Sequence, residues 1–199
     1  IDDNTLVVFC SDNGPSKESY LKQELAADFF NSFGPFDGIK RDLWEGGIRM
    51  PTIVWWPKHI APGRTSVEPS QSQDWMATFA DAAGVPVPAR CDGVSLIPQL
   101  TGVGTQKPST IYVEYFNEGK TPQYDEFFAE HRGRVRKQMQ SLRIGDFQGV
   151  RYNIQSHSDD FEIYNVVSDP QETHNLAGDK KIAALQQQMK NSVLQLRLP

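Results

Sequence analysis

The chain of 199 residues carries 20 Lys and Arg against 25 Asp and Glu, a formal net charge of −5, and 38% of its residues are hydrophobic. This acidic balance argues against a nucleic-acid-binding protein and against attraction to an anionic membrane surface. No apolar run approaches the roughly 20 residues that cross a bilayer, and two cysteines are too few for a disulfide framework. The length and composition predict an ordinary globular chain that can bury a core.

The first predicted element is a strand at residues 5–10, which stops abruptly at a turn. Its continuous apolar run is typical of a strand buried on both faces, as in the interior of a parallel sheet. Chemistry in open α/β sheets gathers at the carboxyl ends of such strands, where Asp12 and Asn13 follow directly. Both side chains offer hard oxygen donors suited to Ca²⁺ or Mg²⁺. Taken alone, however, Asp-Asn-Gly is also ordinary turn chemistry, and by itself the segment favours a plain turn.

Alternating strands and helices are predicted up to about residue 104. Apolar residues at four-residue spacing favour a helix over residues 19–33, and a second buried strand covers residues 52–56. A further helix over residues 71–83 ends at Gly84, a natural helix stop. Its apolar face is expected to consist of Trp75, Phe79 and Ala83.

The pattern then changes to short strands and one final helix. Strands are predicted at residues 111–116, 140–144, 149–155 and 161–166. The charged stretch at residues 125–137 has helical propensity, and residues 180–198 predict an amphipathic helix that Asp179 can cap. These boundaries divide the chain into residues 1–108 and an α+β subdomain at residues 109–199, in which a four-stranded antiparallel sheet packs on the C-terminal helix.

A second motif gives the Asp-Asn-Gly turn a chemical meaning. Residues 38–51 read Gly-Ile-Lys-Arg-Asp-Leu-Trp-Glu-Gly-Gly-Ile-Arg-Met-Pro. A strand that ends in Ser-Asp-Asn-Gly, followed by Lys-x-x-x-Trp-Glu-Gly-Gly-x-Arg-x-Pro, resembles the arylsulfatase-like sulfatase family of the alkaline-phosphatase-like superfamily. The resemblance implies that Asp12 and Asn13 are metal ligands and that Lys40 contacts the sulfate of the substrate. Glu45 and Arg49 match the structural turn after the lysine, and we expect their opposite charges to pair across it.

Three further motifs extend the resemblance over almost the whole chain. They are a D-x-x-x-T-x-x-D-x-x-G helix from Asp74, an Asp92-Gly93-Val94-Ser95-Leu96 segment, and a C-terminal signature with Asp169-Pro170-Gln171-Glu172 and Asn175-Leu176-Ala177. The implied fold is part of an alkaline-phosphatase-like α/β/α sheet followed by the smaller α+β subdomain.

The nucleophile of the family has no counterpart here. Sulfatases carry a cysteine in a C-x-P-S-R or C-x-A-x-R context, which is oxidised to formylglycine. Cys10 and Cys91, the two cysteines of the chain, lie in other contexts. We therefore expect the chain to be the C-terminal portion of a sulfatase, lacking the formylglycine-bearing N-terminal part, and to be inactive by itself.

The histidines add one further candidate. His131 lies among Arg132, Arg134, Arg136 and Lys137, a cationic cluster that could bind an anionic saccharide, although a solvated helix face is the favoured interpretation. His59, His157 and His174 are expected to face solvent.

The leading hypothesis is a Ca²⁺-dependent sulfatase (with Mg²⁺ as the alternative ion) that acts on sulfated sugars or aryl sulfates. The alternatives are a phosphomonoesterase or phosphodiesterase of the same superfamily, and a non-catalytic sulfatase-like binding or assembly module. The expected partners are the sulfated substrate, the N-terminal half of the same protein and, through exposed strand edges, a second copy of the chain; nucleic acid and membrane are not expected. The resemblance implies a periplasmic or secreted protein.

Overall fold

The computed structural model describes residues 2–17, 22 and 27–197. Its chain forms two compact units, residues 1–10 with 52–111 and residues 11–51 with 112–199. The segment 11–51, which carries both sequence motifs, thus packs with the C-terminal strands. The predicted domain boundary at residue 108 concerns the domains of a whole sulfatase and stays a prediction.

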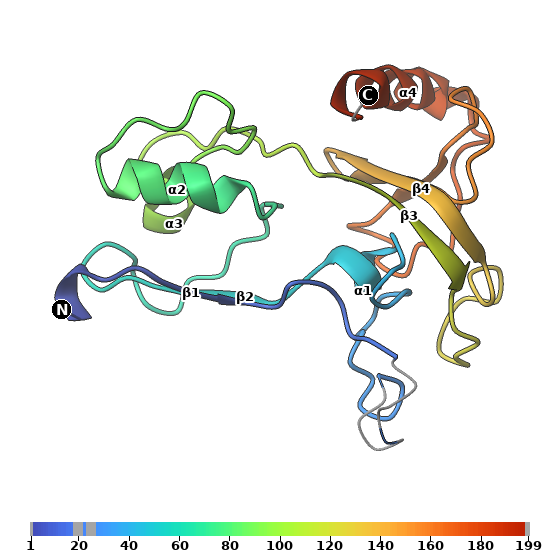
Figure 1. Cartoon of the computed structure of the whole chain (residues 1–199), viewed down its shortest axis with the longest axis horizontal. Helices are drawn as coiled ribbons and strands as arrows, with labels where there is room; N and C mark the ends of the chain where they lie inside the picture. Colours follow the sequence, from blue (N-terminus) through green and yellow to red (C-terminus); the bar gives the residue numbers. More distant parts are fainter. Residues whose placement is uncertain (1, 18–21, 23–26, 198–199) are drawn as a thin grey trace. The chain divides into compact units, whose positions relative to one another are not determined.

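In its described part, the first unit contains a strand pair and short helices (Figure 1). Strands β1 (Val7–Cys10) and β2 (Thr52–Trp55) pair antiparallel, with Phe9 opposite Ile53. A 3-10 helix at Asp2–Asn4 precedes β1, and α2 (Asp74–Ala82) and α3 (Ile97–Thr101) follow β2. None of the helices among the described residues has the length and apolar character needed to span a membrane.

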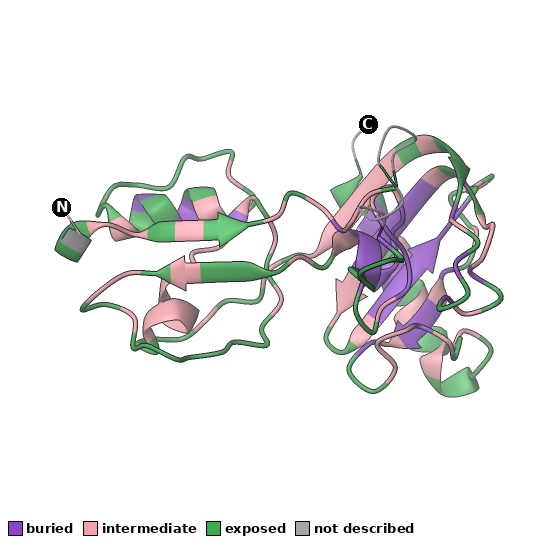
Figure 2. Ribbon diagram, turned by 90° about the horizontal axis from the view of Figure 1, so that it is seen from below, coloured by how far each residue is buried: buried purple, intermediate pink, exposed green. Residues whose placement is uncertain are grey.

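Both predicted strands form, but in the described chain they pair antiparallel with each other and are largely exposed, where burial on both faces in a parallel sheet was expected. Val7 and Phe9 are 45% and 70% exposed, and their cross-strand neighbours Trp55 and Ile53 are 49% and 64% exposed. The reason is that β1 and β2 form a sheet of two strands within the described chain, so no second layer covers this face. Figure 2 shows the two strands as largely exposed.

Helix α2 also forms where it was predicted, but it packs through a different face. Phe79 is 47% exposed, whereas Asp74 and Thr78 are buried. The polar side chains are buried because they hold the following loop: Val94 N donates to Asp74 Oδ1 at 2.9 Å, and Leu96 N donates to Thr78 Oγ1 at 2.9 Å. The D-x-x-x-T pattern is therefore a loop anchor.

The second unit is built on a four-stranded antiparallel sheet in the order β3-β4-β5-β6. Its strands are β3 (Tyr112–Lys120), β4 (Val135–Ile144), β5 (Phe147–Arg151) and β6 (Glu162–Asn165). A 3-10 turn (Lys180–Ile182) leads into the C-terminal helix α4 (Ala183–Leu196), and Asp179 caps this turn by accepting from Lys181 N at 2.9 Å. The predicted sheet, hairpin and capped helix are all confirmed.

The two faces of this sheet bury different partners (Figure 1). On one face α4 inserts Met189 and Val193, both nearly fully buried, into a cluster with Leu142 and Ile163 of the sheet and with Phe161, which precedes β6. On the other face Leu43 and Trp44 pack into a cluster formed by Met139, Val150, Tyr152, Tyr164 and Val166. Side chains of successive strand residues point to opposite faces, which explains the division. The loop that carries Lys40 is therefore packed directly on the sheet.

Two predicted helices are not found in the described chain. Residues 125–133 form turns and β4 begins at Val135, so the predicted helix at residues 125–137 is wrong. Gly133, with φ of +67°, and the buried Phe127 fix irregular backbone there. Residues 19–21 and 23–26 of the predicted helix at residues 19–33 lie outside the described residues, and residues 27–33 form turns.

Candidate functional site

The two motifs lie against each other inside the second unit. Gly14 N donates to Gly47 O at 2.9 Å, and Lys40 N donates to Pro15 O at 2.7 Å. This approach requires glycine, because a Cβ on Gly14 would lie 2.0 Å from Gly46 O. Two backbone hydrogen bonds thus bring the Asp12–Asn13 turn next to the Lys40 turn, as the joint interpretation of the motifs requires.

Asp12 and Asn13 present oxygen atoms at this junction. The Asp12 side chain is exposed and Asn13 is half-buried. Asn13 Nδ2 donates to Gly14 O at 2.9 Å, which turns the amide oxygen away from that carbonyl, and Ser11 Oγ donates to Asn13 O at 2.8 Å. Carboxylate and amide oxygens suit a hard cation, but Ca²⁺ takes about six to eight oxygen ligands. The described residues contain no group of three or more His, Cys, Asp or Glu side chains that could hold a metal, so the pair fits as one side of a metal site.

Lys40 lies in a tight turn. Asp42 N donates to Ile39 O at 2.8 Å, and Ile39 N donates back to the Asp42 carboxylate at 3.1 Å. Between them Arg41 adopts a positive φ of +76°. Lys40 is half-buried. Its backbone is held by the bond from Lys40 N to Pro15 O and by the turn that the bond from Asp42 N to Ile39 O closes.

The turn is attached to the sheet by a buried ion pair. Arg136 donates to Asp42 through Nε at 2.8 Å and Nη2 at 3.0 Å, and Thr121 Oγ1 donates at 2.7 Å. Asp42 and Arg136 are 1% and 6% exposed. Burial alone would lower the pKa of the Arg136 guanidinium, and the hydrogen bonds and charge of Asp42 raise this pKa above its ordinary value. Sequence reasoning had placed Arg136 in a cationic surface cluster, and the structure corrects that placement.

His131 is likewise a core residue. It is 1% exposed, its ring stacks on Trp44 with centroids 3.9 Å apart, and Nδ1 lies 2.6 Å from Asp37 Oδ2. Asp37 also accepts from Phe128 N at 2.8 Å and from Gln171 Nε2 at 2.9 Å. The position of His131 on a cationic surface is thus wrong, and its role in substrate binding stays a prediction.

The remaining cations of the predicted cluster are mostly paired. Arg134 binds Glu162, and Arg132 Nη1 lies 3.5 Å from Asp125 Oδ1. Lys137 is exposed. Because the carboxylates neutralise these groups, the cluster is not a free anion-binding surface. His59, His157 and His174 are exposed, as predicted.

The Glu-Gly-Gly segment forms the single-turn helix α1 (Glu45–Ile48). Arg49 Nη1 lies 3.0 Å from Glu45 Oε2, which confirms the predicted pair. Glu45 N donates to Glu172 Oε2 at 2.7 Å, and Leu43 N donates to the Tyr152 hydroxyl at 2.5 Å. Glu172 is fully buried, and burial together with the charges of Glu45, Asp37 and Asp169 raises the pKa of its carboxyl well above the ordinary value. This shift favours the protonated form of the Glu172 carboxyl.

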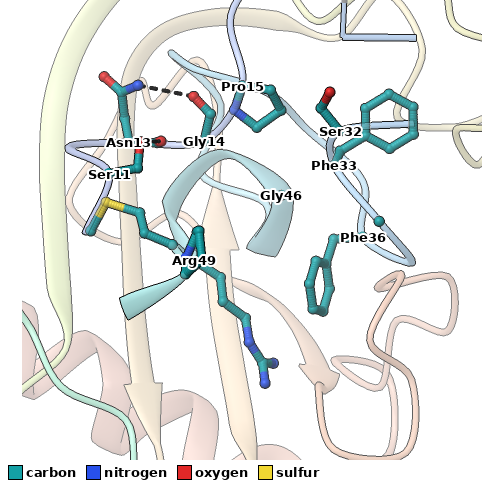
Figure 3. Close-up of a pocket in the computed structure, with 12 residues that line it drawn as sticks. Ser11, Asn13, Gly14, Pro15, Ser32, Phe33, Phe36, Gly46 and Arg49 are labelled. Atoms are coloured by element: carbon teal, nitrogen blue, oxygen red, sulfur yellow. Dashed lines mark hydrogen bonds between the residues drawn. The ribbon is translucent and has the colours of Figure 1, made fainter. Parts of the chain in front are cut away.

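A pocket of about 540 Å³ opens beside the junction (Figure 3). Ser11 and Asn13 line one side, Phe33 and Phe36 line the other, and Gly46 lies between them. The Arg49 guanidinium lies over the Phe36 ring at 4.9 Å. The pocket offers an apolar wall and a cation next to a candidate metal ligand.

Sequence reasoning missed the supports of the Lys40 turn. Asp42 was named only as a sequence neighbour of Lys40, and Asp37 was not singled out. Glu172 was quoted as part of a motif without a role. The sequence offered a signal for Glu172, because this residue belongs to a motif of the resemblance. It offered none for Asp37 and Asp42, because their partners His131 and Arg136 are each 94 residues away along the chain.

The family model and the curated relatives agree on one family. The family model "N-sulphoglucosamine sulphohydrolase, C-terminal" matches residues 32–198. The chain is 33% identical over 196 residues to an N-acetylglucosamine-6-O-sulfatase of Bacteroides thetaiotaomicron, covering 94% of this chain and 29% of that protein. It is 36% identical over 115 residues to the steryl-sulfatase of Mus musculus, covering 57% of this chain and 18% of that protein. The chain therefore spans less than a third of the length of these relatives.

The fold is shared with solved structures as well. One is a protein in complex with its substrate D-glucosamine-2-N,6-O-disulfate, with a TM-score of 0.63 and 24% identity, covering 98% of this chain and 34% of that chain. At this identity the likeness concerns the fold.

Proposed function

Because the chain belongs to the sulfatase family, whose C-terminal region it matches, we propose that it supplies two metal ligands and a sulfate-binding lysine to a sulfuric ester hydrolase. The observation that carries the proposal is the junction of the two motifs. Gly14 N–Gly47 O and Lys40 N–Pro15 O hold the candidate ligands and the candidate sulfate contact together. A binding or assembly module would have no need of this arrangement.

The proposed substrate is a sulfated saccharide. The bacterial relative is named for 6-O-sulfated N-acetylglucosamine, and a protein of the same fold is described with a disulfated glucosamine. The pocket beside Asn13 has aromatic walls from Phe33 and Phe36, and aromatic faces suit the apolar face of a sugar ring. An aryl sulfate would fit the same wall.

The proposed role of Lys40 is to stabilise the negative charge on the sulfate group as it reacts. Attack at sulfur spreads negative charge over the non-bridging oxygens, and fixed cations that face this charge are an important protein contribution. A compact ammonium with three donors can pair with one such oxygen. Asp12 and Asn13 would hold Ca²⁺, or Mg²⁺, and a bound divalent ion supplies Lewis-acid polarisation of the ester. The backbone hydrogen bond from Lys40 N to Pro15 O holds the backbone of Lys40 beside the segment that carries this ligand pair.

The nucleophile comes from outside these residues. Neither Cys10 nor Cys91 has the sequence context of a formylglycine precursor, so the formylglycine and the other metal ligands belong to the N-terminal part of a sulfatase. The 199-residue chain by itself is expected to be inactive towards sulfate esters and to bind Ca²⁺ weakly. The compartment proposed from family resemblance is the periplasm or the cell exterior, and the partners are the sulfated saccharide and the N-terminal part, with no nucleic acid and no membrane.

The test is a sulfatase assay of the protein expressed from its complete reading frame. Sulfate release is measured from 6-sulfated N-acetylglucosamine and an aryl sulfate, and phosphate release from an aryl phosphate. We expect Lys40→Ala to lower kcat/KM by about 100-fold or more, the size of one lost electrostatic contact to the transition state. Lys58→Ala is the matched control, because Lys58 is exposed and pairs with Asp3. Equal activity of the two variants, or a preference for the phosphate ester, would overturn the proposal.

A further inference from the structure

We infer that Arg136 is a positioning residue for Lys40 and acts through the buried carboxylate of Asp42. The inference rests on the proposed function in one respect, namely that Lys40 contacts the sulfate. It names a residue on strand β4 that lies 96 positions from Lys40 in the sequence and outside all of the family motifs.

The Asp42 carboxylate closes the Lys40 turn and fastens it to the sheet at the same time. Oδ2 accepts from Ile39 N at 3.1 Å and from Arg136 Nη2 at 3.0 Å. Oδ1 accepts from Arg136 Nε at 2.8 Å and from Thr121 Oγ1 at 2.7 Å. Each oxygen thus has two donors, one of them from Arg136. If the guanidinium moves, the carboxylate that shapes the turn moves with it.

Burial makes the arrangement rigid and makes Arg136 necessary. The side chains of Asp42 and Arg136 are 0% and 8% exposed. A buried carboxylate without its cation is strongly unfavourable, whereas a bidentate pair with all donors satisfied is stable in one geometry. Lysine could not replace this fork, since an ammonium is a point charge.

The backbone of β4 aims Arg136 at Asp42. Side chains alternate along a strand, and by this alternation Arg136 would share the face of Leu142, which packs with α4. Lys137, the next residue, has a positive φ of +55°, which interrupts the alternation and lets Arg136 reach the other face. Asn153 N also donates to Arg136 O at 2.7 Å. Such strained backbone persists where the surroundings fix it.

A direct role of Arg136 in binding an anionic substrate is not compatible with this geometry. Its Nε and Nη2 groups donate to Asp42, and the residue is 6% exposed. Arg134, two residues earlier on the chain, is the natural control. It also pairs with a carboxylate, Glu162, but its side chain is 30% exposed, and its guanidinium lies over the rings of Trp44 and Tyr152, at 6.0 and 5.7 Å, rather than on Asp42.

The first arm of the experiment is amide hydrogen exchange of the 199-residue chain, which needs no substrate. Arg136→Gln should lower the protection of the Lys40 amide, relative to the amides of strand β5, by about tenfold or more, the size of one charge-assisted hydrogen bond. Arg134→Gln should leave this ratio unchanged. The double variant Asp42→Asn with Arg136→Gln buries no unpaired charge, so its global stability should recover while the Lys40 ratio stays low. A Lys40 ratio that stays at the wild-type value in Arg136→Gln, or that recovers together with global stability, would overturn the inference.

The second arm is kinetic and uses the protein from its complete reading frame. Arg136→Gln should lower kcat/KM for the sulfate ester in the wild-type background and have no further effect in the Lys40→Ala background. Additive losses would contradict a role through Lys40. If Lys40→Ala itself has no effect, the proposed function fails, and the exchange arm still decides whether Arg136 positions the turn.

Discussion

The contact between the two motifs can be tested with a single methyl group. Gly14→Ala would place Cβ 2.0 Å from Gly46 O and 2.9 Å from Gly47 Cα, whereas ordinary contacts begin at 3.4 Å. Both neighbours are backbone atoms, so the Asp12–Asn13 turn must move away from α1. The movement breaks both Gly14 N–Gly47 O and Lys40 N–Pro15 O.

The expected cost follows from these two effects. Forcing an extra carbon into a packed site costs about 1 to 3 kcal/mol, and each lost hydrogen bond costs about 1 kcal/mol. The variant should therefore be about 3 to 5 kcal/mol less stable, a large share of the roughly 5 to 15 kcal/mol of a typical domain. With a urea dependence of about 2 kcal/mol per M, the midpoint should fall by about 1.5 to 2.5 M.

The assay is urea unfolding followed by tryptophan fluorescence, to which the buried Trp44 contributes, with Gly178→Ala as the control. A Cβ on Gly178 meets no atom within 4 Å, so its midpoint should stay close to the wild-type value. Equal midpoints for Gly14→Ala and Gly178→Ala would refute the close packing of the two motifs.

Three further results are expected. The buried Glu172 has a raised pKa, so its stabilising contribution is present below the ordinary value of 4.5 and is lost as the pH rises through the folded-state value. In thermal unfolding from pH 4.5 to 8, the free energy of unfolding of the wild type should therefore fall relative to that of Glu172→Gln by up to about 1.4 kcal/mol per pH unit. The same pH dependence in both proteins would contradict a raised pKa of Glu172. Trp44→Ala, which empties a fully buried site, should cost about 3 to 5 kcal/mol in chemical denaturation, and a loss below 1 kcal/mol would place Trp44 outside the core. The exposed apolar face of β1 and β2 should promote self-association, so light scattering should show a smaller mean mass for the double variant Phe9→Ser with Ile53→Ser than for the wild-type chain, and a monomeric wild-type chain would contradict this prediction.

The local features of the fold were accessible from the sequence. Short apolar runs between turn residues predicted the four strands of the sheet, and the apolar stripe of α4 predicted the last helix, although Asp179 caps the 3-10 turn that leads into it rather than α4 itself. The pairing of Glu45 with Arg49 was predictable because both residues lie on one turn. Burial was predicted less well, since an apolar run such as that of β1 says which residues can be covered but not what covers them.

The candidate site divides in the same way. The motifs identified Asp12, Asn13 and Lys40, and the structure adds that backbone hydrogen bonds join their turns. The support by Arg136 could not be predicted, because charged residues in a polar run usually remain solvated. Its position depends on the irregular backbone at Lys137 and on contacts that cross 94 residues of sequence.

A crystal structure of the protein from its complete reading frame, grown with Ca²⁺ and inorganic sulfate, would test the central claim most directly. The account predicts an anomalous Ca²⁺ peak about 2.3 to 2.6 Å from oxygen atoms of both Asp12 and Asn13. It also predicts a sulfate oxygen within hydrogen-bond distance of Lys40 Nζ, about 2.7 to 3.2 Å. A cation bound elsewhere with Asp12 facing solvent, or a sulfate that Lys40 does not reach, would contradict the account.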